Sequence, residues 1–279
     1  MKITFFFWNI NKKPIQSIIR KLALYHQVDV IMLAECDIHP GTMLSVLNQD
    51  TDILYDYALD NNCKRINIYT RFPSEYIETM DDPLSEIDRA DRLSMRHLKL
   101  PGLTDISLLV THFVSKDNWT DNSQSFEWYR LSDKIKWFEN SIGHSRTVLV
   151  GDLNTSPFES GVISAGGLHG TMSRIIADRK TRAIQGKEYP FFYNPMWNFL
   201  GDFNSETPGT YYYPNAEHEA LFWHAFDQVL IRPDLLSRFD NEDLKILTSD
   251  GEISFLNESG IPDKNVASDH LPLLFKLDL

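Results

Sequence analysis

The sequence predicts an α/β fold in which helices cover β-sheets, and three successive segments carry this prediction. Residues 2–9 are dense in aromatic and β-branched side chains, which favour a strand. Pro14 then opens a segment whose apolar residues recur at roughly helical spacing as far as His26. Residues 28–34 form an apolar run bounded by Glu35, which is typical of a strand buried on both faces. A strand, a helix and a buried strand in succession indicate sheets covered by helices.

The remaining elements follow from the same signals. A short helix is expected at residues 42–47, and a long amphipathic helix at residues 123–140. Further strands are expected at residues 53–57, 65–71, 92–100, 107–113, 146–150, 226–231 and 271–277. The loop leaving the strand at 146–150 is expected to contain Gly151, Asp152, Leu153 and Asn154.

The segment 166–223 is rich in aromatic residues but weak in periodicity. It is interpreted as a long, mostly ordered insertion beside the active face. Two roles remain open for its aromatic side chains: a satellite core beneath long loops, or a platform for substrate.

Composition limits the function classes. The chain has 279 residues, of which 42% are hydrophobic, and no linker or low-complexity run divides it, so one domain spanning 1–279 is expected. A formal net charge of -12 argues against a protein that coats DNA stoichiometrically, but not against an enzyme whose own carboxylates hold a cation. The apolar start is too short for a secretory signal, and no membrane span is expected. Cys36 and Cys63 fit neither a disulfide framework nor a zinc spacing, which favours the cytoplasm.

Polar residues stand at the ends of the predicted strands. Each of these residues closes, follows or opens an apolar run: Asn9, Glu35, His112, Asp152, Asn154, Asp227, Asp269 and His270. Strand ends that open on one edge of a sheet are a natural place to gather a site. Carboxylate and carboxamide oxygens suit a hard cation such as Mg²⁺, and histidines suit proton transfer around a phosphate.

Six motifs in a fixed order resemble those of the endonuclease/exonuclease/phosphatase (DNase I-like) superfamily. They are Trp8-Asn9, Leu33-Ala34-Glu35, Thr111-His112, Gly151-Asp152-Leu153-Asn154-Thr155-Ser156-Pro157, Phe226-Asp227-Gln228-Val229-Leu230 and Ser268-Asp269-His270-Leu271-Pro272-Leu273. Each motif alone is weak, but six in order across nearly the whole chain are a strong signal. The resemblance implies a four-layer α/β/β/α sandwich, in which two packed mixed β-sheets are flanked by helices.

The resemblance also implies roles for these residues. Glu35 matches the principal metal ligand, with Asn9 beside it and Asp269 as a further metal-site carboxylate, for Mg²⁺ or alternatively Mn²⁺. Asp152 matches the residue that orients or deprotonates the attacking water, and Asn154 matches one that holds phosphate or nucleophile. The remaining matches are His270, which contacts the scissile phosphate, Asp227, which hydrogen-bonds that histidine, and His112, which protonates the leaving oxygen or stabilises phosphate charge.

Other residues depart from the pattern or imitate it. In DNase I-like members a glutamate supports the histidine that His112 resembles, whereas the corresponding residues 62–67 contain no carboxylate. Gly201-Asp202-Phe203-Asn204 repeats the Gly-Asp-x-Asn pattern but lies in an aromatic loop too close to Asp227, so it is not assigned to the site. Gly209-Thr210-Tyr211 is interpreted as a structural approach to the site. Arg130, on the long helix, is left outside it.

The function that follows is a metal-dependent phosphodiester hydrolase, with a nuclease, either an endonuclease or an exonuclease, as the leading hypothesis and nucleic acid as the expected substrate. A phosphatase or a phospholipid or inositol phosphoesterase is the alternative. It is weakened by Gln228, which stands where inositol 5-phosphatases carry arginine, and by the lack of a membrane-insertion segment. A non-catalytic binding scaffold is the third hypothesis, and the complete set of eight polar residues argues against it. The sequence shows no basic stripe and does not reveal the oligomeric state.

Overall fold

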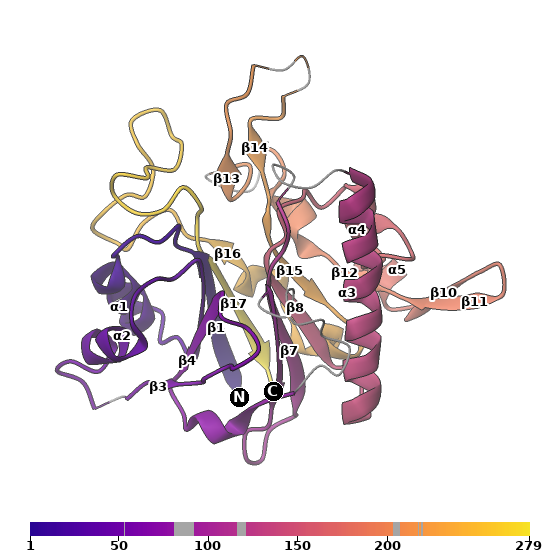
Figure 1. Ribbon diagram of the computed structural model, residues 1–279, viewed down its shortest axis with the longest axis horizontal. Helices are drawn as coiled ribbons and strands as arrows, with labels where there is room; N and C mark the ends of the chain where they lie inside the picture. Colours follow the sequence, from indigo (N-terminus) through magenta and orange to yellow (C-terminus); the bar gives the residue numbers. More distant parts are fainter. Residues whose placement is uncertain (53, 81–91, 116–120, 203–206, 217, 219) are drawn as a thin grey trace.

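Two mixed β-sheets pack face to face between helices in the computed structural model of the protein (Figure 1). The structure describes residues 1–279 except 53, 81–91, 116–120, 203–206, 217 and 219. No helix within the described residues is long and apolar enough to cross a membrane.

Among the described residues the first sheet has six strands, and its centre is built from two of the three segments that predict the fold. Strands β1 (Lys2–Asn9) and β2 (Val30–Ala34) pair in parallel, with Asn9 opposite Ala34. The order of strands across the sheet is β16 (Lys245–Ile246), β17 (Leu273–Asp278), β1, β2, β4 (Ile66–Thr70) and β3 (Asp56–Tyr57).

The second sheet has seven strands, and β7 (Ile106–His112) and β8 (Thr147–Asp152) pair in parallel within it. Across the sheet the order is β5 (Ile77–Thr79), β6 (Leu93–Leu98), β7, β8, β15 (Asp227–Ile231), β12 (Phe192–Tyr193) and β9 (Gly170–Thr171).

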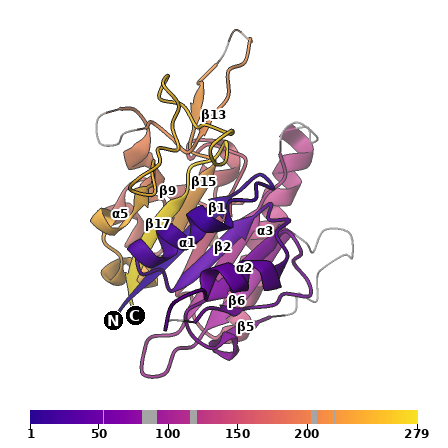
Figure 2. The ribbon, with the colours of Figure 1, turned by 90° about the vertical axis from the view of Figure 1, so that its left-hand side faces the viewer.

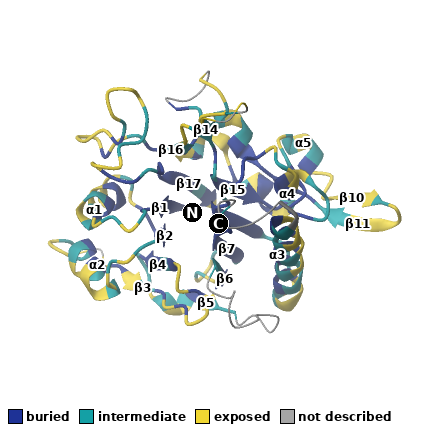
Figure 3. Cartoon of the chain, turned by 45° about the horizontal axis from the view of Figure 1, so that its top comes forward, coloured by how far each residue is buried: buried dark blue, intermediate teal, exposed yellow. Residues whose placement is uncertain are grey.

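The two faces of each central strand explain the four layers. Successive side chains of a strand point to opposite faces. In β1, Phe5 and Phe7 therefore join the core between the sheets, while Phe6 and Trp8 join the core beneath the helices. The outer face of the second sheet has a third core of its own, which includes Leu109 of β7. Figure 3 shows buried strands between partly exposed helices, and the predicted α/β/β/α sandwich is confirmed.

Helices complete the outer layers. Helices α1 (Gln16–Tyr25) and α2 (Pro40–Leu47) lie over the first sheet, as Figure 2 shows, and bury Ile19, Leu22 and Met43 there. The long helix α3 (Asp121–Ile142) covers the second sheet with Leu131, Ile135 and Phe138. The described residues also include the short helices α4 (Ser160–Ile163) and α5 (Arg174–Ala177) and 3₁₀ turns at Ser74–Tyr76, Pro195–Phe199, Pro233–Arg238 and Asn241–Asp243.

The aromatic segment 166–223 contributes residues both to the hydrophobic cores and to the lining of the candidate pocket. Phe191, Phe192 and Tyr193 are buried in the hydrophobic cores, and β12 and β9 extend the second sheet. Two hairpins project from the body: β10 (Thr181–Ile184) with β11 (Lys187–Pro190), and β13 (Tyr211–Tyr212) with β14 (Trp223–His224) (Figure 1). The first half of the segment is therefore structural, whereas the second half brings Tyr211 to the candidate site.

Two predicted boundaries were wrong. Gly151 and Asp152 belong to β8 rather than to its exit loop, because β7 and β15 continue to pair with them. The strand expected at 53–57 is only Asp56–Tyr57, and residue 53 lies outside the described residues. The other predicted strands and helices are present, with ends shifted by a few residues.

Candidate active site

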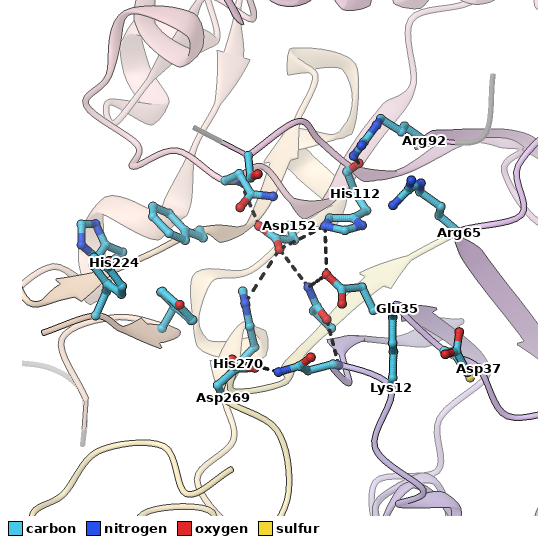
Figure 4. Close-up of a pocket in the computed structure, with 18 of the residues that line it drawn as sticks. Lys12, Glu35, Asp37, Arg65, Arg92, His112, Asp152, His224, Asp269 and His270 are labelled. Carbon is cyan, nitrogen blue, oxygen red and sulfur yellow. Dashed lines mark hydrogen bonds and ion pairs between the residues drawn. The ribbon is translucent and has the colours of Figure 1, made fainter. Parts of the chain in front are cut away.

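One pocket of about 910 Å³ opens where the central strands of both sheets end (Figure 4). Seven of the eight predicted site residues line it: Asn9, Glu35, His112, Asp152, Asn154, Asp269 and His270. The eighth, Asp227, lies behind His270 and is hydrogen-bonded to it. The polar residues predicted at strand ends are therefore brought together.

The register of the second sheet aligns the centre of the site. Asp152, at the end of β8, stands opposite His112 of β7 on one side and opposite Asp227 of β15 on the other. A Cβ on the neighbouring Gly151 would come within 1.9 Å of the Thr111 backbone oxygen. Only glycine allows β7 and β8 to approach this closely, and the close approach keeps Asp152 aligned with His112.

Asp152 lies at the centre of the site. Its Oδ2 accepts a hydrogen bond from Asn9 Nδ2 at 2.9 Å and lies 3.8 Å from His112 Nε2 and 3.9 Å from His270 Nε2. Its Oδ1 accepts from the backbone N–H of Asn154 at 2.9 Å. The side chain is buried, and burial raises the carboxyl pKa, an effect that the positive charge of His270 opposes and the negative charge of Asp227 reinforces.

His270 is held in its charged form. Burial lowers its pKa, but the Asp227 and Asp152 carboxylates together outweigh burial and raise the pKa to about 10. The ring donates through Nδ1 to Asp227 Oδ2 at 2.8 Å. The imidazolium therefore carries a fixed positive charge, with Nε2 directed to Asp152 and the pocket (Figure 4).

His112 has the opposite character. Burial lowers its pKa, and the nearby Arg92 and Arg65 lower it further, although Asp152 raises it. Its Nε2 lies 3.3 Å from Glu35 Oε1, and its buried Nδ1 has no partner among the described residues. Glu35 thus contacts His112 from the end of β2. The segment 62–67, where DNase I-like members carry the supporting glutamate, contains no carboxylate.

Glu35 is placed by the backbone that follows β2. It adopts a left-handed φ of 47°, which disfavours a side-chain residue by roughly 1–2 kcal/mol. Its carbonyl accepts from the Lys12 N–H at 2.8 Å, which ties the exits of β1 and β2 together. The turn brings the carboxylate to 3.5 Å from Asn9 Nδ2. Such strain at a pocket edge is typical of functional sites.

The donor set fits a hard divalent cation at Glu35. Its carboxylate is partly exposed to the pocket, and no described side chain hydrogen-bonds its Oε2. Asp152, Asp227 and His270 also bring candidate ligand atoms within 4.8 Å of one another, and in this group His270 Nδ1 is already hydrogen-bonded to Asp227 Oδ2 at 2.8 Å. Asp269 lines the same pocket, where its Oδ2 accepts from Asn11 Nδ2 at 3.0 Å rather than from Asn9.

Asn154 follows Asp152 in a left-handed conformation with a φ of 49°. Its side-chain amide donates to the Phe113 carbonyl at 3.0 Å, which fixes the side chain at the pocket wall. A carboxamide has two N–H donors, so the second can meet a ligand oxygen.

Several lining residues were missed by sequence reasoning. The cations Lys12, Lys64, Arg65 and Arg92 line the pocket, although the sequence shows no basic stripe. They come from three segments, one after β1, one before β4 and one before β6, and only Lys64 and Arg65 are adjacent in the sequence. The pair Lys64-Arg65, in the segment noted for lacking a carboxylate, was the available signal.

An aromatic wall faces the cations across the site, and the sequence had indicated only that the aromatic segment 166–223 lies beside it. Tyr211, His224 and Phe226 line the pocket, and the rings of Tyr211 and His224 stack on Phe226 at centroid distances of 5.4 and 4.6 Å. Figure 4 places His224 beyond Asp152, on the side opposite Arg65 and Arg92.

The residues kept outside the site also have defined places. Thr210 accepts a hydrogen bond from the Asp227 N–H at 3.1 Å and Tyr211 bridges to His270, so the Gly209-Thr210-Tyr211 segment supports the site as expected. Arg130 pairs with Glu127 on α3 at 3.6 Å and does not line the pocket. In the second Gly-Asp-x-Asn motif, Phe203 and Asn204 lie outside the described residues.

Comparison with known proteins identifies the fold. The sequence matches no protein-family model and no curated protein. Among solved structures, an endonuclease/exonuclease/phosphatase family protein from Leptotrichia buccalis superposes with a TM-score of 0.59 and 15% identity over 99% of this chain and 100% of that one. An AP endonuclease from Archaeoglobus fulgidus gives 0.57 and 15% over 99% and 100%. D. rerio TDP2 complexed with a single-strand DNA product gives 0.56 and 14% over 100% and 99%. The chain has the DNase I-like fold of the endonuclease/exonuclease/phosphatase superfamily.

Proposed function

We propose that this protein, as one catalytic domain spanning 1–279, is a divalent-metal-dependent phosphodiester hydrolase that acts on nucleic acid. The observation that carries the proposal is the buried Asp152 carboxylate, which accepts from Asn9 and lies within 4 Å of two histidines in a pocket where the strands of both sheets end. The proposal includes a cytoplasmic location, in keeping with a chain of only two cysteines, Cys36 and Cys63, whose spacing suggests no disulfide framework.

The proposed mechanism is direct attack of water on phosphorus. Asp152, whose pKa is raised by burial, accepts a proton from the water, and the hydrogen bonds from Asn9 and Asn154 orient its two oxygens. The His270 imidazolium, held charged by Asp227, stabilises the negative charge that develops on the phosphate oxygens. As the bond from phosphorus to the leaving oxygen breaks, His112 protonates that oxygen or stabilises the charge on the phosphate, and the Asn154 amide holds a phosphate oxygen in the same pocket.

Glu35, Asn9 and Asp269 are the residues that would hold Mg²⁺, with Mn²⁺ as the alternative ion. The ion, when bound, would neutralise phosphate oxygens that otherwise repel the nucleophile. Glu35 carries most of this proposal because its carboxylate faces the pocket beside Asn9.

Nucleic acid is favoured as substrate by the two walls of the pocket. Cations on one side suit a phosphodiester backbone, and the aromatic wall of Tyr211, His224 and Phe226 suits a base, because aromatic rings stack on nucleobases. Two of the similar structures are an AP endonuclease and a TDP2 with bound single-strand DNA product, which supports the same substrate class.

The test is a substrate panel assayed with Mg²⁺, with Mn²⁺ and with EDTA. The substrates are linear and circular DNA in single- and double-stranded form, RNA, bis-p-nitrophenyl phosphate and inositol phosphates. We expect metal-dependent cleavage of a polynucleotide that is lost in Glu35→Ala and His270→Ala and retained in Arg130→Gln, the control on α3 outside the pocket. Cleavage of circular substrates would identify an endonuclease. Release of phosphate from inositol phosphates without polynucleotide cleavage would overturn the nuclease proposal in favour of a phosphatase.

A further inference from the structure

Two arginines stand beyond the proposed catalytic centre, on the side of His112. Arg65 directly precedes β4 of the first sheet, and Arg92 directly precedes β6 of the second. Both line the pocket, and Figure 4 draws both on the side of His112 that faces away from His270. Two strand ends that lie 27 positions apart in the sequence, one from each sheet, thus deliver a pair of guanidinium groups to one wall of the pocket.

The position of this pair is fixed by contacts with the site. Arg92 Nη1 donates to the carbonyls of His112 and Phe113, each at 3.4 Å, at the point where β7 ends. Both arginines line the same pocket as His112, and Figure 4 draws their guanidinium groups on the His112 side of it. Arg65 itself is exposed to solvent, so a ligand can reach it.

A single phosphate bound at the proposed catalytic centre would not contact Arg65 and Arg92. In the proposed mechanism the scissile phosphate lies beside Asp152, where it would meet the His270 imidazolium and the cation that Glu35 would hold. The arginines lie on the far side of His112 from His270, so they face a different part of the substrate. A planar guanidinium offers two parallel N–H donors that match two oxygens of a phosphate. The two arginines on this wall of the pocket also contrast with the net charge of -12 of the whole chain.

We propose that Arg65 and Arg92 form a second phosphate-binding subsite, next to the scissile phosphate on the side of His112, so that the preferred substrate carries at least two phosphate groups. This inference rests on the proposed function, because it takes the centre at Asp152 as the place of the scissile phosphate. The aromatic wall at His224 then receives the part of the substrate on the other side of the scissile bond.

Binding provides the first test, because it does not require turnover. Calorimetry would compare thymidine 5′-monophosphate with thymidine 3′,5′-bisphosphate, which share the base, the sugar and one phosphate. With Mg²⁺ present, we expect the bisphosphate to bind at least about tenfold more tightly, since each charge-assisted hydrogen bond contributes appreciably. The preference should fall to about one in the Arg65→Gln/Arg92→Gln variant and to an intermediate value in Arg65→Gln, which leaves the Arg92 contacts with β7 intact. Arg130→Gln should keep the full preference.

Hydrolysis separates this inference from the proposed function. The p-nitrophenyl esters of the same two nucleotides at the 5′-phosphate carry the same scissile bond, and the wild-type preference in kcat/KM should parallel the binding preference. Equal affinity for both nucleotides in the wild type, or a preference that survives in the double variant, would overturn the subsite. A binding preference without hydrolysis of either ester would leave the subsite standing and count against the hydrolase. Hydrolysis without a binding preference would do the reverse.

Discussion

The two ends of the second sheet carry the same residue types and differ in what those residues do. At the pocket end, Asp152 and Asp227 contact His112 and His270. At the opposite end, where β7 and β8 begin, Asp105 Oδ2 lies 2.9 Å from His97 Nε2 and 3.1 Å from His144 Nε2. Both groups bring carboxylate and imidazole atoms within 4.8 Å. Residue type alone therefore does not distinguish them.

The ratio of carboxylates to their basic partners separates the two ends. At the far end one partly exposed carboxylate serves two histidines and Arg146; burial raises the Asp105 pKa, but these partners outweigh burial and lower it to about 2. At the pocket end two buried carboxylates raise the pKa of one histidine to about 10. The His144 ring further lacks a free acceptor, because its Nδ1 accepts from the Arg146 N–H at 3.2 Å. The cluster at Asp105 thus connects strand ends to one another, whereas the cluster at the other end directs the charged His270 ring and the Asp152 carboxylate at the pocket.

The largest effect is expected for Asp152→Asn. Removal of the proposed base should lower kcat by about 10²–10⁴-fold, the range of general acid–base catalysis, while the fold is kept. Steady-state hydrolysis of the substrate found in the panel would measure it. Asp105→Asn is the matched control at the far end and should leave kcat/KM unchanged. Equal losses in the two variants would remove the distinction between the ends.

Asp227→Asn should give the next largest loss, on the order of 10²–10³ in kcat, because the charge of His270 is no longer held. Without that carboxylate, burial lowers the His270 pKa, so the loss should grow as the pH rises through neutrality. In the wild type the ring should stay protonated until the pH approaches about 10, and NMR titration of its ring protons would show this. By linkage, the stability from this charge is fully present below the unfolded pKa of about 6.5 and is lost as the pH rises towards 10. A wild-type His270 that titrates near pH 6.5 would contradict the assignment.

Gly151→Ala tests how tightly the strands meet at the pocket end. The new Cβ would lie 1.9 Å from the Thr111 oxygen, so β7 and β8 must separate, and the free energy of unfolding should fall by at least about 3 kcal/mol. Gly143→Ala, near the start of β8, meets no atom within 4 Å and should cost only about 1 kcal/mol for its φ of 78°. Urea unfolding would compare the two. Similar losses would show that the strands are no closer at the pocket than elsewhere.

The smallest effect is expected for the stability of Asp105→Asn. Its ion pairs are partly exposed, so the free energy of unfolding should fall by less than about 1 kcal/mol at neutral pH. Because its folded pKa is lowered, the stabilisation is present above about pH 4 and is lost as the pH falls towards 2. Unfolding curves of wild type and variant should therefore converge in acid. A difference that persists at pH 2 would assign the effect to packing.

The sequence by itself determined the central strands and the residues at their ends. Phe5, Phe6 and Phe7 are all buried but join alternate cores, because both faces of β1 are apolar. Such a pattern lies within one short window of the sequence. The order of the motifs, from Asn9 to His270, was sufficient to predict seven residues of the pocket wall and the Asp227 partner behind it.

Tertiary structure alone decided what these residues become. The pKa of His270 depends on Asp227, which is 43 positions away, and on the register that sets Asp152 opposite Asp227. The cationic wall forms because Arg65 and Arg92 precede strands of different sheets, and the packing of the two sheets brings both arginines to one pocket. The physical reason is one of range. Strand propensity and burial pattern act between neighbours in the chain, whereas charge, desolvation and pocket shape are sums over atoms that only the packing of the two sheets makes neighbours.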